Sequence, residues 1–545
     1  MNYKKLLYLV VTFLLSGIEL LFPNTNYYVD KNANGTNNGS SWDNAWVSFN
    51  DINWNIIQPG DTIFISGGAD SLVYEEMIDV PKYKSGTGGN PITITRATDP
   101  GHDGVVILDG INLPELPAVR VDRSSYITVN GLKTIRWLSY PSNLGTFDVF
   151  GSDHIIIENN IMEAWSQGLK ISESNNCIFR NNRYTTPEYI ENQTDGIYAY
   201  LNYDNIYEGN YINISNGSPD DHNDCFQGQT EGPCIIRNNI IMHSGPSALK
   251  PIQSQGLFDK YTNGLHQYIN NLIYLPNKST PQQEMDDGVL DQQNPTSEYP
   301  GTGEPASIIA LNNTVIGAST HTFAFESDQL ICKNNIVILL DDNGEVKYTD
   351  NIDFSQIDYN LYYVNNTTGN NIIGAQYTLS EWQQFGADLH SLNENPLLDA
   401  DFKPTSDSPV IDAGADLSAL GVTADITGLN RPQGSAYDIG AYEFDGTTSV
   451  NDGIILKPEN YILGQNYPNP FNPSTTIRIT IPKEGKVHLA VYDILGQKVK
   501  DLVNGFMKAG IYNFNFNAGN LTSGVYLYRL DSGSFTDIKK MILLK

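Results

Sequence analysis

The middle of the chain repeats a short pattern of alternating apolar and polar residues around an Asn-Asn or Gly-Asn pair. Placed in register, the repeats are "IIIENNIM", "CIFRNNRY", "NIYEGNYI", "CIIRNNII", "HQYINNLI", "IIALNNTV" and "LICKNNIV". The last Asn of each pair stands at positions 160, 182, 210, 239, 271, 313 and 335, so the separations are 22, 28, 29, 32, 42 and 22 residues. A minimum of 22 residues with a variable excess indicates a repeat unit that carries insertions.

Each repeat has the composition of short β-strands. Runs of Ile, Val, Tyr and Phe alternate with polar residues and are split by small polar turns, which is typical of strands and leaves no room for a helix. Such units can bury their apolar faces as a parallel β-helix, in which each coil lies about 4.8 Å from the next. Asn tolerates the left-handed backbone of a sharp turn, and stacked Asn amides can hydrogen-bond along the axis. We predict an all-β chain whose main domain is a right-handed parallel β-helix.

The insertions gather at one place in the unit, after the third strand of a coil and before the first strand of the next. The clearest are "TTPEYIENQT", "SNGSPDDHN" and "LPNKSTPQQEMDD". Repeat proteins often place such insertions on one face, which becomes the binding face. We therefore expect the functional face beside the first strands.

The two ends of the repeat region resemble those of secreted β-helix polysaccharide enzymes of the pectate-lyase-like superfamily. The stretch from "YYVDKNANGTNNGSSWDNAW" through "QPGDTIFISGG" is similar to their start and first coil. The stretch from "SPVIDAG" to "YDIGAYEF" is similar to their closing segment. Residues 26–444 are therefore predicted to form one β-helix domain, and a polar linker is predicted at 445–458.

The C-terminal part carries three distinctive segments, "YPNPFNPSTTI", "VYDILGQKV" and "LTSGVYLYRL". They resemble the C-terminal sorting domain of proteins exported by the type IX secretion system, and the resemblance covers residues 459–545. The alternating strands predict a small β-sandwich. The resemblance implies contact with the secretion machinery, passage through the outer membrane, and release or attachment at the cell surface. An ordinary carbohydrate-binding sandwich is the alternative, and neither interpretation makes this part catalytic.

The first residues, "MNYKKLLYLVVTFLLSG", place two lysines ahead of an apolar run and predict a secretory signal peptide over residues 1–22. The run is shorter than the about 20 residues of a membrane span, so no transmembrane span is expected in the mature protein.

The net charge of -30 argues against nucleic acid as a partner, because phosphate binding needs a basic surface. Four cysteines in so long a chain predict buried free thiols, and we expect a monomer.

Period-two alternation sorts the first strand of each coil into two faces. The strands are "QGLKIS" from 167, "DGIYAY" from 195, "DCFQGQ" from 224, "SALKPI" from 247, "DGVLDQ" from 287 and "HTFAFE" from 321. The side chains expected to point inward are Leu169, Ile197, Phe226, Leu249, Val289 and Phe323. The outward row is expected to hold Lys170, Tyr198, Gln227 and Lys250, with neighbours about 5 Å apart. Lys170, Tyr198 and Gln227 are candidate substrate-binding residues.

Four carboxylates enter the same face within one coil spacing, Asp195, Asp220, Asp221 and Asp224. They would repel one another unless a cation lies among them, and hard oxygen ligands of this kind suit Ca²⁺. The alternative is a solvated turn, since Asp and Asn are ordinary turn residues. His222, within the same stretch, is a candidate substrate-binding residue or a hydrogen-bond partner of a neighbouring carboxylate.

The segments "TDGIYAY", "DDHNDCF" and "ALKP" resemble family 9 polysaccharide lyases over about 60 residues. The resemblance implies that Asp195, Asp220, Asp221 and Asp224 bind calcium and that Lys250 is the catalytic base. It implies β-elimination, in which the base takes the C5 proton of a uronic acid while the cation neutralises the adjacent carboxylate. Lys170, about 14 Å from Lys250 on the coil spacing, would bind the carboxylate of another sugar.

Two other functions use the same residues. "QTDGI", "NDC" and "HSG" faintly resemble polygalacturonase-type glycoside hydrolases, which use carboxylates as general acid and base, although Asn223 stands where an aspartate is expected. A non-catalytic carbohydrate-binding β-helix or adhesin is the other alternative, because a fold alone does not specify a function. The sequence therefore favours a secreted protein that acts on an acidic polysaccharide, with a calcium-assisted lyase as the leading hypothesis.

Overall fold

The computed structural model describes most of the chain in segments. The described residues are 24–113, 115–137, 144–163, 167–186, 195–214, 223–229, 232–243, 254–260, 262, 264–275, 288–293, 306–317, 321–340, 344–348, 352–364, 372–373, 377–446, 462–463, 466, 471–481, 484–494, 496–507, 510–519, 521–533 and 535–544. The chain divides into two compact units, Met1–Leu397 with Asp407–Asp445, and Leu398–Ser406 with Gly446–Lys545. The predicted signal peptide lies outside the described residues.

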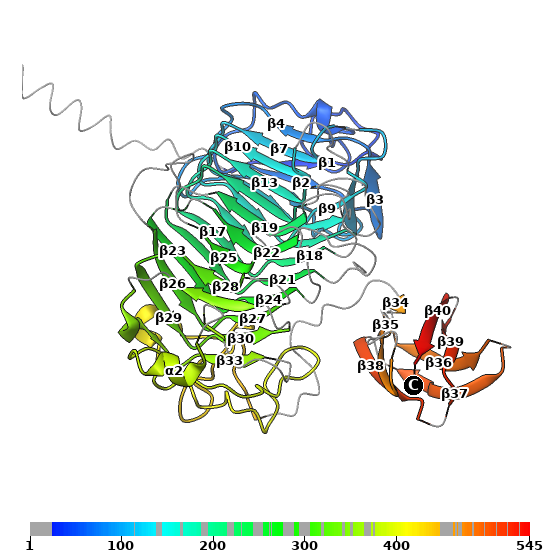
Figure 1. The fold of residues 1–545 in the computed structure, drawn as a ribbon. Helices are drawn as coiled ribbons and strands as arrows, with labels where there is room; N and C mark the ends of the chain where they lie inside the picture. Colours follow the sequence, from blue (N-terminus) through cyan, green and yellow to red (C-terminus); the bar gives the residue numbers. More distant parts are fainter. Residues whose placement is uncertain are drawn as a thin grey trace, which may run out of the picture. The chain divides into compact units, whose positions relative to one another are not determined.

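Three long parallel sheets build the first unit (Figure 1), because each coil contributes one strand to each sheet. The first of these, sheet A, has twelve described strands: β1 (Asn26–Val29), β2 (Thr62–Ile65), β5 (Ile92–Arg96), β8 (Ile127–Asn130), β11 (Ile156–Glu158), β14 (Ile178–Arg180), β17 (Asn205–Glu208), β20 (Cys234–Arg237), β23 (Gly264–Ile269), β26 (Ala306–Leu311), β29 (Gln329–Lys333) and β32 (Ile357–Asp358).

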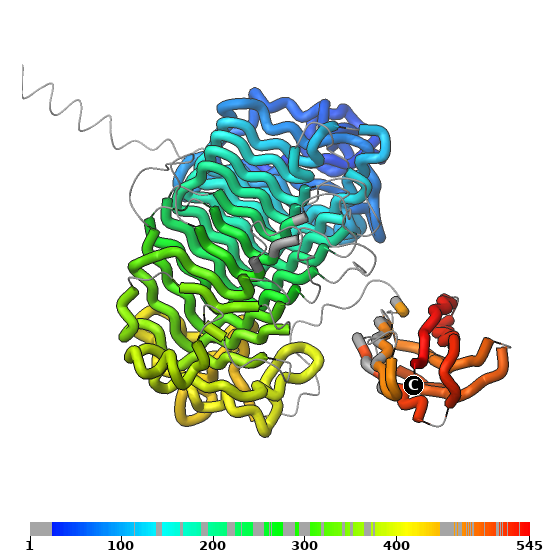
Figure 2. The backbone as a smooth tube through the Cα atoms, in the orientation of Figure 1, coloured from blue at the N-terminus to red at the C-terminus, as the bar shows by residue number. Residues whose placement is uncertain are grey.

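Sheet B, which follows sheet A along the chain of each coil, has eleven described strands: β3 (Ser71–Tyr74), β6 (Val105–Asp109), β9 (Lys133–Ile135), β12 (Ile161–Glu163), β15 (Arg183–Thr185), β18 (Tyr211–Ile214), β21 (Ile240–His243), β24 (Leu272–Leu275), β27 (Thr314–Gly317), β30 (Ile336–Leu339) and β33 (Leu361–Val364). Sheet C has ten: β4 (Ile78–Val80), β7 (Val119–Asp122), β10 (Phe147–Phe150), β13 (Leu169–Ser172), β16 (Ile197–Tyr200), β19 (Asn223–Gln229), β22 (Ser254–Asp259), β25 (Gly288–Gln292), β28 (His321–Phe325) and β31 (Glu345–Tyr348). The stacked coils, visible in Figure 2, confirm the predicted parallel β-helix.

A ladder of buried Asn side chains runs along the axis at the turn between sheets A and B. In each step, the Nδ2 of one Asn donates to the Oδ1 of the next at 2.9–3.2 Å, through Asn160, Asn182, Asn210, Asn239, Asn271, Asn313, Asn335 and Asn360. The backbone N–H of each residue also donates to the same Oδ1 in the next coil, as from Asn210 to Asn239 at 2.9 Å. The predicted hydrogen bonding of stacked Asn amides is therefore confirmed.

The other residue of each pair supplies the left-handed backbone of the turn. Its φ is +57° at Asn159, +54° at Asn181, +63° at Gly209 and +56° at Asn238. The two asparagines of a pair thus have separate tasks, because one makes the turn and the other fills the coil interior with hydrogen bonds. A turn residue can also bind the closing segment of the domain, as Asn270 Nδ2 donates to the carbonyl of Ala424 at 2.8 Å.

The connections from sheet B to sheet C are long in the middle of the β-helix, whereas those from sheet A to sheet B stay short. β11 ends at Glu158 and β12 begins at Ile161, and the same two-residue turn recurs in the later coils. The segments 186–196, 215–222, 244–253 and 276–287 join sheet B to sheet C. This agrees with the predicted position of the insertions, except that residues 293–305 form a long connection from sheet C to sheet A.

Short helices and a closing segment complete the first unit. The helices are η1 (Phe49–Asp51), η2 (Phe354–Gln356), α2 (Leu379–Gln383) and η3 (Ser418–Leu420). Thr378 caps α2 through a reciprocal bond with Glu381, which satisfies two backbone donors of the first turn.

All four cysteines are buried free thiols, as predicted. Among the described helices, none has the length and apolar composition that a membrane span needs.

The second unit is an antiparallel β-sandwich, as predicted. One sheet contains β34 (Ile462–Leu463), β35 (Ser474–Ile481) and β38 (Gly510–Asn517), and the other contains β37 (Lys498–Met507), β36 (Gly485–Asp493), β39 (Gly524–Ser532) and β40 (Phe535–Leu543). Ile479 from the first sheet and Leu489 and Tyr528 from the second are fully buried in one shared core. This core belongs to the second unit alone.

Candidate functional site

The outer face of sheet C brings together three of the predicted substrate-binding residues. Lys170, Tyr198 and Gln227 are register neighbours on β13, β16 and β19, and Leu169, Ile197 and Phe226 point into the core beside them. The Nζ of Lys170 lies 5.7 Å from the ring centroid of Tyr198, which is a cation–π distance. The predicted alternation of faces is therefore confirmed for these three strands.

The predicted continuation of this row is wrong. The strand that pairs with β19 is β22 (Ser254–Asp259), not the segment from 247, so Phe258 is the register neighbour of Gln227 and Leu257 replaces Leu249 on the inner face. In the following coil Leu290, not Val289, is in register with Phe323. Lys250, the predicted base, lies outside the described residues.

Two of the predicted calcium ligands, Asp195 and Asp224, lie next to each other at the starts of β16 and β19. Both residues are fully buried. The backbone N–H of Asp224 donates to Asp195 Oδ1 at 3.2 Å, and Gln167 Nε2 donates to Asp195 Oδ2 at 3.1 Å. Asp220, Asp221 and His222 lie outside the described residues. Sheet C therefore holds a pair of buried carboxylates one coil apart.

Charges of alternating sign continue the row toward the N-terminal coils. Asp79, Arg120, Asp148 and Lys170 occupy register positions on β4, β7, β10 and β13. Arg120 binds Asp79 with both Nε and Nη2, at 2.9 and 2.5 Å. Burial raises the pKa of Asp148 to about 6, although Lys170 and Arg120 oppose this shift. Burial lowers the pKa of Lys170, against the attraction of Asp148 and Asp195.

Three buried acceptor oxygens near Asp195 and Lys170 accept no hydrogen bond from the residues that the structure describes. They are Asp148 Oδ2, Gln167 Oε1 and Gln227 Oε1. A buried acceptor without a donor costs about 1–3 kcal/mol, so such groups normally have a partner. Their concentration around Asp195 and Lys170 makes this part of sheet C a candidate binding site.

The described residues fit part of a calcium site. Two buried carboxylates next to an amide oxygen provide the hard oxygen ligands that Ca²⁺ prefers. Within the described segments no set of three or more His, Cys, Asp or Glu side chains is close enough to hold a metal ion. A site at Asp195 and Asp224 therefore needs further ligands, and Asp220 and Asp221 are the candidates that the sequence supplies.

The sequence pattern did not identify three polar residues of this region as candidate site residues: Gln167, Asp148 and Lys260. Gln167 opens "QGLKIS" at the position that Asp195 and Asp224 take in the next two coils, so the strand alignment itself contained this signal. Asp148 falls in "FDVF", one coil before the strands that were aligned. Lys260 directly follows β22, and its Nζ lies 4.3 Å from the ring centroid of Phe258.

The Asp148→Asn variant should gain stability relative to the wild type as the pH rises. The pKa of Asp148 goes from the ordinary 3.8 to about 6, so between these values the folded protein binds more protons than the unfolded chain. Its free energy of unfolding therefore falls with rising pH, by up to about 3 kcal/mol, and the amide variant lacks this loss. Urea denaturation of both proteins at about pH 4 and about pH 7 measures the difference. A difference that stays constant with pH would contradict the burial of a titrating carboxyl.

Comparisons with known proteins identify the C-terminal part. Residues 465–544 match the secretion system C-terminal sorting domain, which confirms the predicted sorting domain and indicates a secreted or cell-surface protein. Among solved structures, pectate lyase Pel9A matches with 17% identity and a TM-score of 0.46, over 79% of this chain and 98% of that chain. The GH136 lacto-N-biosidase from Eubacterium ramulus matches with 12% identity and a TM-score of 0.36, over 62% of this chain and 64% of that chain. No curated protein matches the sequence.

Proposed function

We propose that the β-helix is a calcium-assisted polysaccharide lyase that cleaves an acidic, uronate-containing glycan by β-elimination. The observation that supports this function most is the fully buried pair Asp195 and Asp224, one coil apart and beside Lys170 on sheet C. Two adjacent carboxylates removed from water need a counter-charge, and a divalent cation provides it in one ligand.

Asp195 and Asp224 would hold the calcium ion together with Asp220 and Asp221. When bound, the ion would neutralise the uronate carboxylate and make the C5 proton more acidic. Lys170 would hold a second substrate carboxylate, because its ammonium group faces the same side of the sheet as Tyr198. Tyr198 and Gln227 would contact sugar hydroxyl groups, and Gln227 Oε1 is one of the buried acceptors without a described donor.

The base that removes the C5 proton has two candidates. Lys250 is the residue that the family resemblance implies. Lys260 is the candidate that the observed register favours, because it follows the strand next to β19 and lies beside the ring of Phe258. A lysine has an ordinary pKa of about 10.4, so a base at neutral pH requires a lower value, which a nearby cation favours by repulsion.

The experiment measures the ultraviolet absorbance of an unsaturated uronate product on polygalacturonate and alginate, with and without EDTA. Activity should disappear with chelation and fall by about 1000-fold in either Lys250→Ala or Lys260→Ala, whichever removes the base. Lys333→Ala, on the outer face of sheet A, is the matched control and should keep full activity. Absence of the unsaturated product on every uronate polymer, or activity that survives chelation, would contradict the lyase.

One observation favours a glycoside hydrolase as the second candidate. Burial raises the pKa of Asp148 to about 6, a value suited to a general acid, and Lys170 lies between it and Asp195. Hydrolysis by two carboxyl groups would release reducing ends without the ultraviolet-absorbing product. The same polymers, assayed for reducing ends, therefore separate the two reactions, and a carbohydrate-binding protein without activity would give neither signal.

A further inference from the structure

A row of residues after strands β4, β7 and β10 of sheet C connects one coil to the next through backbone hydrogen bonds. Arg123 and Gly151 directly follow β7 and β10 and have left-handed backbones, with φ of +50° and +57°. Tyr83, three residues after the end of β4, has a φ of +65°. The N–H of Tyr83 donates to the carbonyl of Arg123 at 3.1 Å, and the N–H of Arg123 donates to that of Phe150 at 2.8 Å. The row is therefore bonded from coil to coil like the sheet itself.

Arg123 lies across the next coil and stacks on an aromatic ring. The guanidinium carbon is 5.0 Å from the ring centroid of Phe150, and a Cβ added at Gly151 would lie 3.2 Å from Arg123 Cγ. Glu173 and Leu201 adopt the same left-handed backbone further along, so the conformation alone does not require glycine at 151. The space that Gly151 leaves is used by Arg123.

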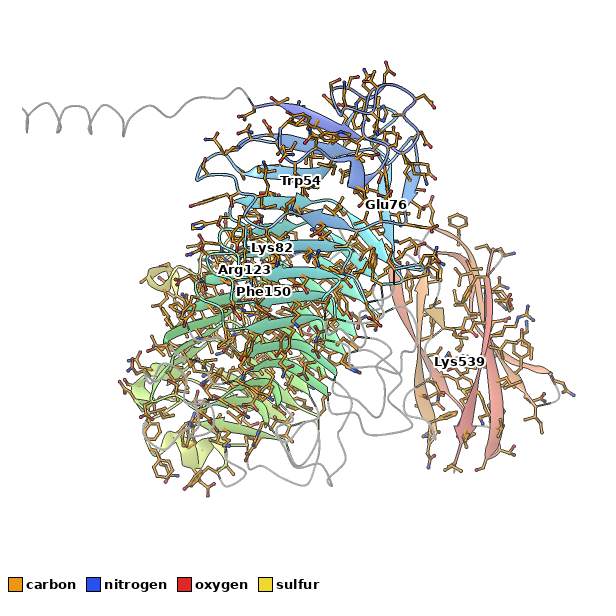
Figure 3. The ribbon with its side chains drawn as sticks, turned by 90° about the horizontal axis from the view of Figure 1, so that it is seen from above. Trp54, Glu76, Lys82, Arg123, Phe150 and Lys539 are labelled. Carbon is orange, nitrogen blue, oxygen red and sulfur yellow. The ribbon has the colours of Figure 1, made fainter. Side chains whose placement is uncertain are left out.

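At this edge the positively charged side chains are more exposed to solvent than the carboxylate with which they pair. Asp122 contacts Lys82 Nζ at 2.9 Å and Arg123 Nη1 at 3.2 Å. The side chain of Asp122 is 13% exposed, whereas those of Lys82 and Arg123 are 58% and 41% exposed. The carboxylate therefore lies beneath two cations that face solvent, in a chain whose net charge is -30. Figure 3 shows Lys82, Arg123 and Phe150 following one another along the stack of coils.

Both cationic groups keep hydrogen-bond donors for a ligand. Among the described contacts of Arg123, the ion pair with Asp122 uses Nη1 alone, and a guanidinium has five donors. Stacking on Phe150 holds the guanidinium plane in place, which favours bidentate binding of a carboxylate. Tyr83, 74% exposed at the same edge, offers an aromatic ring on which a sugar can stack.

We propose that Lys82, Arg123 and Phe150 form a secondary binding site for a carboxylated sugar unit of a long acidic glycan. Phe150 is on β10, two coils before β16, so the site lies about 10 Å from the start of β16 along the axis and is separate from Asp195 and Asp224. The proposal rests on the proposed function for its ligand class. Glycan binding there, however, requires neither the calcium ion nor cleavage.

The test measures binding of the full chain to polygalacturonate, alginate, dextran sulfate and neutral dextran by affinity electrophoresis in the presence of EDTA. The double variant Lys82→Gln and Arg123→Gln should bind the two uronate polymers about tenfold more weakly, because each lost charged hydrogen bond weakens binding several-fold. Arg123→Lys should give a smaller loss, since lysine cannot bind bidentately. The effect should shrink at high ionic strength.

Arg237→Gln is the matched control, because Arg237 has a 42% exposed side chain and an ion pair with Glu208, but lies on sheet A. It should leave glycan binding unchanged. Unchanged binding in the double variant, an equal loss on dextran, or a loss confined to dextran sulfate would overturn the proposal. Because binding is measured without calcium and without turnover, failure of the lyase assay leaves this result interpretable on its own.

Discussion

Asp195→Ala is expected to weaken calcium binding by at least about 100-fold and to abolish any calcium-dependent cleavage. Asp195 is fully buried, and its two carboxylate oxygens accept hydrogen bonds from Asp224 and Gln167. Removal of this carboxylate takes away a proposed metal ligand and the described acceptor of the Asp224 N–H. Isothermal titration calorimetry with Ca²⁺, on the EDTA-treated full chain, measures the change without reference to activity.

Asp79→Ala is the matched control for this experiment. Asp79 lies on the outer face of the same sheet but is paired with Arg120, several coils from Asp195. Calcium binding should be the same in this variant as in the wild type. If Asp195→Ala binds calcium like the wild type while Asp79→Ala does not, the metal lies at another position on the sheet.

Asn239→Ala is expected to lower the free energy of unfolding of the β-helix by about 3–5 kcal/mol. The Nδ2 of Asn239 donates to the carbonyl of Tyr207 and to Asn271 Oδ1, at 2.9 and 3.1 Å. Its Oδ1 accepts from the backbone and side chain of Asn210 at 2.9 and 3.0 Å. Alanine removes all four bonds and leaves buried donors and acceptors unsatisfied. Urea denaturation followed by far-ultraviolet circular dichroism measures the loss.

The neighbouring substitution Asn238→Gly separates the ladder from the turn. Asn238 has a φ of +56°, which glycine adopts without strain, and Gly209 occupies the equivalent position one coil earlier. We expect a change of less than about 1 kcal/mol in this variant. Equal losses in the two variants would mean that the turn, rather than the buried amide of Asn239, limits stability.

The fold was predictable because its hydrogen bonds repeat in the sequence. Asn239 must stand at the same place in its coil as Asn210, since each is both donor and acceptor to its neighbours. The two-residue turns also fix the register of sheets A and B, because a slip of one residue would bring polar side chains into the core. The sorting domain was predictable from local segments that need no knowledge of the β-helix.

The register of sheet C could not be predicted across a long insertion. "SALKPI" from 247 and "SQGLFD" from 254 have similar alternation, and only pairing with β19 selects the second. Packing also favours it, because a Cβ at Gly256 would lie 2.4 Å from the carbonyl oxygen of Val289, so the backbones approach closely there. Such proximity depends on the neighbouring coil and leaves no periodic signal in the strand itself. The buried oxygens of Gln167 and Gln227 likewise appear only once the coils are stacked.

The Asn ladder makes the stacking of coils independent of the length of the polypeptide between them. Asn160 and Asn182 are 22 residues apart and their amides lie at 3.1 Å, while Asn271 and Asn313 are 42 residues apart and their amides lie at 3.0 Å. Segments at the entrance to sheet C can therefore be lengthened, shortened or exchanged without a change in the spacing of the scaffold. New binding preferences in such a molecule would arise by exchange of these segments, while the stacked coils stay unchanged.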